Sequence, residues 1–283
     1  MSANRLPAWR SIDGNTADGS VVHHVVDRGM TSLNRRRFLA GLASAGLLFF
    51  SRRARALGDL SKLRFVRLRL SDLPDPRPTA LRRLAWEVER RTSLATIPDP
   101  LELPIASPDL FRHPLCLLSG DRAFAMPSDA DTVRLRRYLT FGGCLLIDSA
   151  EGRAGGGFDE SVRKLLARVL PGDIPKRVLD DHVLWKSFYI LHDVPGRLVA
   201  SPVLECVERD RRLAVIYTQN DLCGAMARDG FGRWEHDVVP GGEEQRERAF
   251  RFAVNVVMYA FCLDYKTEQA HIDFIMRTRR SRP

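Results

Sequence analysis

Two short apolar runs with a helical pattern between them constrain the fold more than any other feature of this chain. Leu115–Leu118 and Cys144–Ile147 are continuous apolar segments, which is the pattern of strands buried on both faces of a sheet. The residues between them predict a helix that begins with the capping pair Ser128 and Asp131 and ends at Gly142-Gly143. Strand, helix and strand in this order predict a right-handed parallel crossover.

Further elements of both kinds flank this unit. Alternating basic and apolar residues from Leu63 to Leu70 predict a strand with one solvent-exposed face. Proline-rich segments such as Ile97–Pro100 are interpreted as loops. The other predicted elements are a helix from Thr79, a helix after the glycine-rich loop at about Phe158–Val169, a hairpin of Val203–Val207 with Leu213–Tyr217, and a helix from about Glu243 to about Phe261. Together they predict a three-layer α/β sandwich with a mainly parallel sheet.

Polar residues follow the predicted strands, at the carboxyl edge where open parallel sheets gather their ligands. Ser119 and Asp121 come directly after the first apolar run, and Asp148 ends the second. Asp221 follows the last strand of the predicted hairpin and joins the same edge. Two carboxylates at such an edge can hold a cation or transfer protons, and the alternative is that Asp121 and Asp148 cap loops and helices.

Three further segments suggest chemistry. Asp181 and His182 precede an aromatic stretch, which suits the wall of a pocket. Cys223 is the only cysteine in a polar, turn-like setting, and as a nucleophile it needs a base, for which His182 is the one attractive partner. Gly155–Gly157 precede a helix and can present N–H groups to a phosphate, but they lack the lysine of a P-loop. For each segment the alternative is a purely structural role.

The five cysteines all lie after residue 56, which is an odd number for an oxidising compartment. Cys116 and Cys144 belong to apolar runs, and we expect them to be buried as small hydrophobic residues. The sequence has no CxxC pair and no cluster of His and Cys at zinc spacing, so it predicts no structural metal site and indicates no particular cofactor. A disulfide is left as an alternative, because the sequence does not indicate which two cysteines would form it.

A twin-arginine block, Arg35-Arg36-Arg37-Phe38-Leu39, opens an apolar run that is shorter than the ~20 residues needed to span a bilayer. Ala54-Arg55-Ala56 then supplies a small-x-small cleavage site, with cleavage expected after Ala56. The arrangement resembles the signals of the twin-arginine translocation route, which carries folded proteins. We therefore expect a periplasmic or otherwise exported protein with the translocase as its partner during export, or a membrane-tethered protein if the signal stays uncleaved.

The predicted cleavage site divides the chain into three parts with different charge. Residues 1–56 form a presequence, of which 1–29 stay untranslated if Met30 is the true start. This part holds nine arginines and three aspartates, a net charge of +6 out of the +9 of the whole chain. Residues 57–276 form one α/β domain and residues 277–283 a basic tail. Because most of the excess charge belongs to the presequence and the tail, nucleic-acid binding is not expected.

Several segments after residue 56 combine into a recognisable pattern. They are Leu84-Ala85-Trp86 to Arg91-Thr92-Ser93, Leu115–Asp121, Leu135–Leu139 with Gly142–Asp148, Phe158–Ser161 and Asp181-His182. The pattern resembles a bacterial family described only as domain of unknown function 4159, whose members are exported alone or joined to the membrane-anchored part of proteins similar to aerotolerance regulators. The resemblance implies a flavodoxin-like fold similar to the class I glutamine amidotransferases and a membrane or periplasmic protein as partner. It implies no established activity.

The amidotransferases place a catalytic cysteine on a sharp elbow directly after a strand. In this chain Cys144 begins its strand, and no cysteine follows Asp148, so amidotransferase chemistry is not expected. We expect instead a non-catalytic module that binds a ligand or a partner protein. Its candidate residues are Ser119, Asp121, Asp148, Asp181, His182, Asp221 and Cys223. Two alternatives stay open, a hydrolase that uses these groups with a metal or through Cys223 and His182, and a carrier of a cofactor loaded before export.

Overall fold

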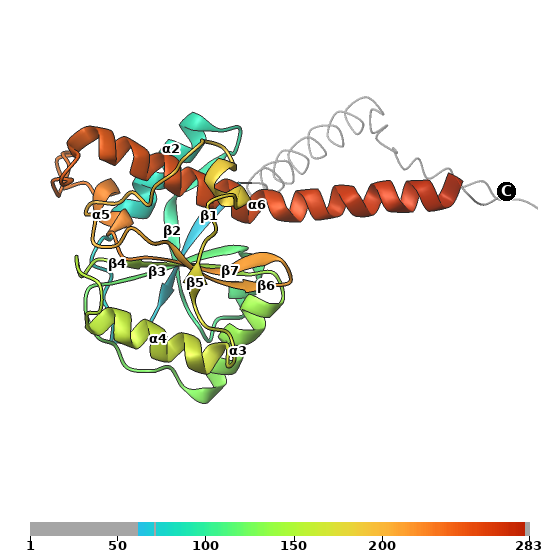
Figure 1. The fold of residues 1–283 in the computed structure, drawn as a ribbon, viewed down its shortest axis with the longest axis horizontal. Coiled ribbons are helices and arrows are strands. Elements are labelled where there is room, and N and C mark those ends of the chain that lie inside the picture. Colours follow the sequence, from blue (N-terminus) through green and yellow to red (C-terminus); the bar gives the residue numbers. More distant parts are fainter. Residues whose placement is uncertain (1–61, 71, 281–283) are drawn as a thin grey trace, which may run out of the picture. The chain divides into compact units, whose positions relative to one another are not determined.

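A seven-stranded sheet lies between two layers of helices (Figure 1). The computed structural model describes residues 62–70 and 72–280, with side chains described as far as Phe261. The predicted presequence, with its twin-arginine block and cleavage site, lies outside the described residues. The three-layer α/β fold predicted from the sequence is confirmed, whereas the likeness to glutamine amidotransferases stays a prediction.

The strands follow the spatial order β2-β1-β3-β4-β7-β6-β5, which is not their order in the chain. The first five of these are parallel, and β6 runs antiparallel to both of its neighbours. The parallel part explains the continuous apolar runs, because helices cover both of its faces. The strands are β1 (Leu63–Arg69), β2 (Thr96–Pro104), β3 (Leu115–Gly120), β4 (Cys144–Ser149), β5 (Lys176–Arg177), β6 (Glu205–Arg209) and β7 (Arg212–Thr218).

Helices cover the two faces of the sheet unequally, as Figure 1 shows. One face carries α2 (Ala80–Arg91), α5 (Leu222–Met226) and α6 (Gly242–Arg280), and the other carries α3 (Asp129–Thr140) and α4 (Gly157–Val169). Two short 3-10 helices, η1 (Pro108–Arg112) and η2 (Val183–Lys186), lie in the connections. Neighbouring residues of a strand point to opposite faces. Phe65 and Val66 of β1 therefore belong to different hydrophobic cores, one under each helical layer.

The solvent-exposed face predicted for Leu63–Leu70 is wrong. Strand β1 pairs with β2 on one side and β3 on the other, so it lies inside the sheet and helices cover it. Arg67 is only 7% exposed, and its guanidinium pairs with Asp75 and, at 2.7 Å, with Glu102. One of the arginines in the alternating segment is therefore buried and held by carboxylates, whereas Arg69 at the end of the strand is exposed.

The loop predicted at Ile97–Pro100 is also wrong, because these residues belong to the edge strand β2. A proline cannot donate a ladder hydrogen bond, and edge strands tolerate this since one side of the strand has no partner strand. The register also shifts, because Arg64 pairs with Ile97 whereas Val66 pairs with Leu101. The prolines leave β2 poorly suited to pairing with a further strand, and β5 at the other edge is only two residues long.

The predicted ends of α3 are confirmed, and the predicted end of α6 is not. Ser128 Oγ accepts the N–H of Asp131 at 3.1 Å, and Gly142 has the positive φ of 115° that ends the helix. Helix α6 continues to Arg280, well beyond the predicted end near Phe261 and into the predicted basic tail. Its added residues contain neither Gly nor Pro. Within residues 62–70 and 72–280, no helix combines the length and apolar content needed to cross a bilayer.

Candidate functional site

Three buried polar side chains lie in a row at the carboxyl edge of the sheet. Ser119 of β3 pairs in register with Asp148 of β4, and Asp148 pairs in register with Thr218 of β7. Residues in register on neighbouring strands lie on the same face, here the face covered by α2, α5 and α6. None of the three is more than 6% exposed. The edge predicted from the sequence is therefore real, but its central groups lie inside the protein.

Asp148 is bound to the start of helix α5. Its two carboxylate oxygens accept the backbone N–H groups of Leu222 at 2.8 Å and Cys223 at 2.7 Å. Burial raises the pKa of Asp148 to about 7, and the negative charge of Asp221 adds to this shift. These contacts are those of a helix cap, which is the structural role considered for Asp148 as an alternative to a binding site. The carboxyl group is also poised to titrate near neutral pH.

Asp221 holds two arginines from distant parts of the chain. Arg77 donates from Nε to Oδ1 at 3.1 Å and from Nη2 to Oδ2 at 2.8 Å, and Arg197 Nε also donates to Oδ2. The Asp221 side chain is fully buried, whereas those of Arg77 and Arg197 are 13% and 22% exposed. Asp221 has a left-handed φ of 52°, and its Oδ1 accepts the N–H of Gly224 at 3.0 Å. We call Asp221, Arg77 and Arg197 the Asp221 cluster.

Asp121 lies at the same edge but faces the solvent. Arg122 donates from Nε to its Oδ1 at 2.7 Å, and this hydrogen bond lowers the pKa of Asp121. The side chain is about one-third exposed, and that of Arg122 is 61% exposed. Asp121 is therefore an accessible acidic group paired with its neighbour, separate from the contacts that hold Asp148 and Asp221.

The polar, turn-like setting predicted for Cys223 is wrong. The residue lies in α5 and is 1% exposed, within the core beneath α6. Burial and the nearby carboxylate of Asp148 raise the pKa of its thiol well above the usual range. A nucleophilic cysteine needs the opposite, a lowered pKa and an accessible sulfur. The thiol thus has the environment of a core residue.

The structure does not bring Asp181 and His182 to the carboxyl edge. His182 caps η2 by accepting a backbone N–H at 3.1 Å, and its ring packs 5.5 Å from that of Tyr259. The Tyr259 hydroxyl accepts the N–H of Leu213 at the start of β7, whereas Cys223 lies beyond the end of the same strand. Asp181 is exposed beside His182. The predicted pairing of Cys223 with His182 is therefore wrong, because the length of β7 separates them.

The phosphate site considered at Gly155–Gly157 is filled by the protein itself. The Glu151 carboxylate accepts the N–H groups of Gly157 at 2.8 Å and Phe158 at 3.0 Å, at the start of α4. An anion at a helix N-terminus is stabilised by the free N–H groups and the helix dipole. Glu151 already supplies this anion, so the loop has a structural explanation.

The sequence does not predict three residues near Asp221, of which the first two belong to the Asp221 cluster. Arg77 comes from the loop after β1, Arg197 from the loop before β6, and His236 from the segment between α5 and α6. Burial lowers the pKa of His236, and the charges of Arg77 and Arg197 lower it further. The one local signal is that Pro78 follows Arg77 and disfavours a helical backbone at Arg77. Nothing in the local sequence marks Arg197 or His236.

The cysteines and acidic groups do not assemble into a metal centre in the part of the chain that the structure describes. There, no group of three or more His, Cys, Asp or Glu side chains is arranged to hold a metal ion. The described cysteines are free and buried, namely Cys116, Cys144, Cys206 and Cys223. The predicted burial of Cys116 and Cys144 is confirmed, and it raises the pKa of each thiol to about 12.

Comparison with known proteins identifies a family. The model of a family described as domain of unknown function (DUF4159) matches residues 63–261. The matched range begins at β1 and ends within α6, so it includes the whole sheet and the Asp221 cluster. No curated protein matches the chain.

Proposed function

This chain belongs to the DUF4159 family of domains of unknown function, and from that premise we propose that its α/β domain is a non-catalytic binding module. One observation carries the proposal. The carboxylates of Asp148 and Asp221 at the carboxyl edge are fully buried, and all four of their oxygens already accept internal hydrogen bonds. Asp148 binds the start of α5, and Asp221 binds Arg77, Arg197 and Gly224. Groups held in this way support the loops of the edge and have no surface on which to receive a substrate.

A hydrolase at the same edge is less well supported. A pKa of about 7 would suit Asp148 as a general acid or base, but a catalytic group must reach the proton that it transfers, and Asp148 is 0% exposed. Cys223 is buried with a raised pKa, and His182 lies at the other end of β7. The contacts therefore favour binding over hydrolysis.

The proposal is tested by a panel of ester, amide, phosphate and glycoside substrates, incubated with the full chain with and without divalent metal ions. We expect no turnover above the rate in buffer. The His182→Ala variant serves as the control because its side chain lies away from the edge. Turnover that falls at least a hundredfold in Asp148→Asn but not in His182→Ala, with unchanged thermal melting of both variants, would overturn the binding module in favour of a hydrolase.

We also propose that the domain is exported after folding, through the twin-arginine route to the periplasm. The proposal rests on Arg35, Arg36, Phe38 and Leu39. We expect the Arg35→Lys/Arg36→Lys variant to accumulate as a cytoplasmic precursor, because the translocase of this route reads the arginine pair. Immunoblots of periplasmic and cytoplasmic fractions measure this.

The matched control for export keeps the same number of exchanges outside the arginine pair. Arg52→Lys/Arg53→Lys retains charge near the predicted cleavage site, and we expect it to reach the periplasm like the natural chain. Normal periplasmic delivery of Arg35→Lys/Arg36→Lys would refute the proposed route.

A further inference from the structure

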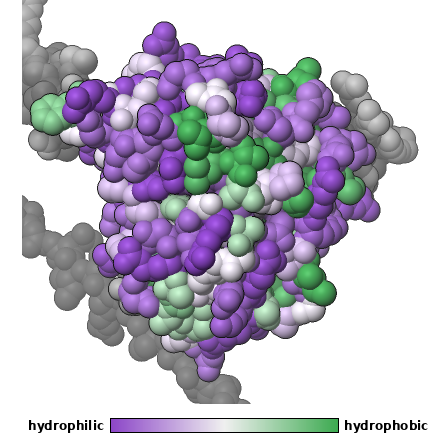
Figure 2. Space-filling model, turned by 60° about the vertical axis from the view of Figure 1, so that its left-hand side comes forward, coloured by the Kyte–Doolittle hydropathy of each residue, from purple (hydrophilic) through white to green (hydrophobic). Residues whose placement is uncertain are grey.

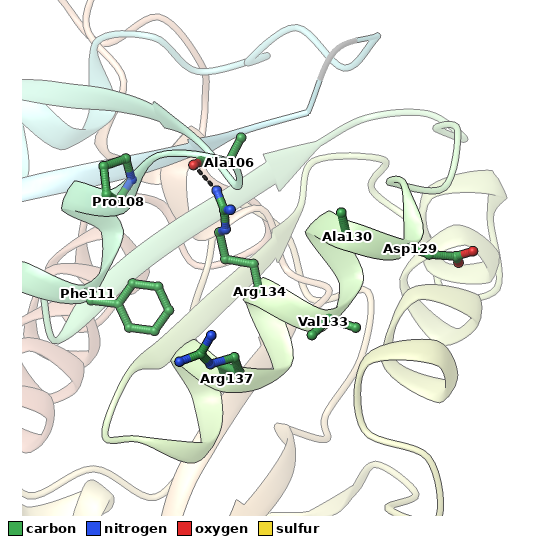
Figure 3. A pocket seen from close by; sticks show the side chains of 8 residues that line it. All are labelled: Ala106, Pro108, Phe111, Asp129, Ala130, Val133, Arg134 and Arg137. Carbon is green, nitrogen blue, oxygen red and sulfur yellow. Dashed lines mark hydrogen bonds between the residues drawn. The ribbon is translucent and has the colours of Figure 1, made fainter.

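The domain exposes several large apolar side chains. The face in Figure 2 is mostly hydrophilic, with hydrophobic residues concentrated in a few areas. Phe111 of η1 and Val133 of α3 are 46% and 48% exposed, and both line a groove of about 890 Å³ between these two helices (Figure 3). This volume is within the range of ligand-binding sites, ~300–1,000 Å³. A groove with apolar walls on the surface indicates a place for a partner.

One side of the groove is a regular stripe of helix α3. Ala130, Val133, Arg134 and Arg137 line it, and their spacing of three, four and seven residues puts them on one face of the helix. The buried residues of the same helix are Thr132, Leu135, Tyr138 and Leu139. Helix α3 thus packs into the core with one face and presents the groove stripe with another.

The opposite side of the groove is an aromatic wall held in place by the core. The Phe111 ring meets the buried Tyr138 ring edge-on, with 6.2 Å between the ring centres. Pro108 begins η1 and also lines the groove. Because Tyr138 is 2% exposed and fixed in the core, Phe111 has a firm backing although its outer surface faces solvent. An ordered aromatic surface of this kind is what binding hot spots use.

The groove also carries two positive charges. Figure 3 shows the side chains of Arg134 and Arg137 beside the Phe111 ring, with Arg134 reaching the carbonyl oxygen of Ala106. Among the described side chains, neither arginine has a carboxylate partner. Among the described lining residues, the acidic one is Asp129, which is bound to Arg168 at 2.6 Å. In the described part of the chain, two guanidinium groups without a paired carboxylate therefore lie next to an apolar surface.

We propose that this groove binds an acidic, apolar peptide segment of a partner protein. A carboxylate of the segment pairs with Arg134 and Arg137, and a Leu or Phe side chain of the segment packs on Phe111 and Val133. Guanidinium groups bind carboxylates through paired, charge-assisted hydrogen bonds, and Arg with aromatic residues is typical of protein interfaces. A nucleic-acid partner fits less well, since residues 57–283 carry only +3, the difference between +9 and the +6 of residues 1–56. This proposal rests on the proposed binding function and gives it a site.

A synthetic peptide array tests the groove. The probes are nine-residue peptides in which two or three Asp or Glu residues alternate with Leu or Phe, and matched peptides carry Asn or Gln instead. Fluorescence anisotropy with the full chain measures the affinities. We expect acidic peptides to bind, their Asn and Gln counterparts to bind at least tenfold more weakly, and the affinity to fall with added salt.

Variants locate the binding within the protein. Arg134→Gln/Arg137→Gln should weaken the binding of acidic peptides at least tenfold, whereas Arg82→Gln/Arg90→Gln, an equal change at two exposed arginines of α2, should leave their binding unchanged. Arg134→Glu/Arg137→Glu should reverse the preference, so that peptides with Lys in place of Asp or Glu now bind better. Circular dichroism verifies that each variant is folded.

Each other outcome overturns the groove as the site. These outcomes are an array without preference for acidic peptides, binding that Arg134→Gln/Arg137→Gln does not weaken, and equal binding to anionic phosphatidylglycerol vesicles or to single-stranded RNA. Self-association of the chain that depends on Arg137 without peptide binding also counts against it. In the second case the binding module stands and its site lies elsewhere. The binding module itself falls only if the substrate panel shows enzymatic turnover, so the two failures are distinguishable.

Discussion

Replacing Asp221 by Asn lowers the free energy of unfolding by about 3–5 kcal/mol, the range found when one partner of a buried ion pair is removed. The Asn side chain has nearly the same shape and tolerates the left-handed backbone at this position. What the substitution removes is the negative charge that faces Arg77 and Arg197, whose guanidinium groups then stay largely buried without the carboxylate that binds them. Urea denaturation at pH 7 measures the change.

The matched control is Asp121→Asn, which removes the same charge at the same edge of the sheet. Asp121 pairs with an exposed arginine, Arg122, and exposed ion pairs contribute ~0–1 kcal/mol. We therefore expect its unfolding free energy to stay within about 1 kcal/mol of the natural chain. If Asp221→Asn changes stability as little as Asp121→Asn, the Asp221 cluster does not hold the edge.

The natural chain loses stability relative to the Asp148→Asn variant as the pH rises from about 4 to above 7. The pKa of Asp148 is about 7 in the folded protein, against an ordinary value of 3.8. Between these pH values the folded state keeps a proton that the unfolded state has released. The stability contributed by the neutral carboxyl group is thus fully present below about 4 and is lost as the pH rises through about 7.

Paired urea titrations at pH 5, 6, 7 and 8 measure this difference in stability. We expect the difference in free energy of unfolding between the natural chain and Asp148→Asn to change by up to ~1.4 kcal/mol for each pH unit between the two pKa values. Asp121→Asn is again the control. Arg122 lowers the pKa of Asp121, so any pH dependence of its contribution lies on the acidic side and should be absent from pH 5 to pH 8. A constant gap between the natural chain and Asp148→Asn would contradict the buried titrating carboxyl group.

The sequence predicts the centre of this fold better than its margins. The apolar runs of β3 and β4 indicate strands because helices cover both of their faces. Positions buried on both faces are mostly occupied by apolar residues, so the sequence itself shows the burial. The edge strand β2 contains three prolines and reads as a loop, since only its position at the margin of the sheet makes them tolerable. Arg67 likewise reads as solvent-exposed, because its carboxylate partners come from other segments.

The candidate site is predictable only where it belongs to the strands. Asp148 lies near the end of β4 and Asp221 follows β7, so topology alone places them at one edge. Arg77 is 144 residues from Asp221, and no local pattern reports a partner at such a separation. His182 was misplaced for a related reason. The aromatic residues near it suggested a pocket wall, but η2 packs on α6 through Asn255, which donates to Leu184 and accepts from Tyr189.

The bond between Arg77 and Asp221 also sets an order of events during synthesis. A ribosome finishes β1 and its loop early, yet the carboxylate that receives the Arg77 guanidinium is translated only after β7. Until then water solvates the Arg77 guanidinium, and no carboxylate of Asp221 holds the loop after β1 in place. A chain truncated before residue 221 therefore cannot close this end of the domain, and closure of the edge reports that all seven strands have been translated.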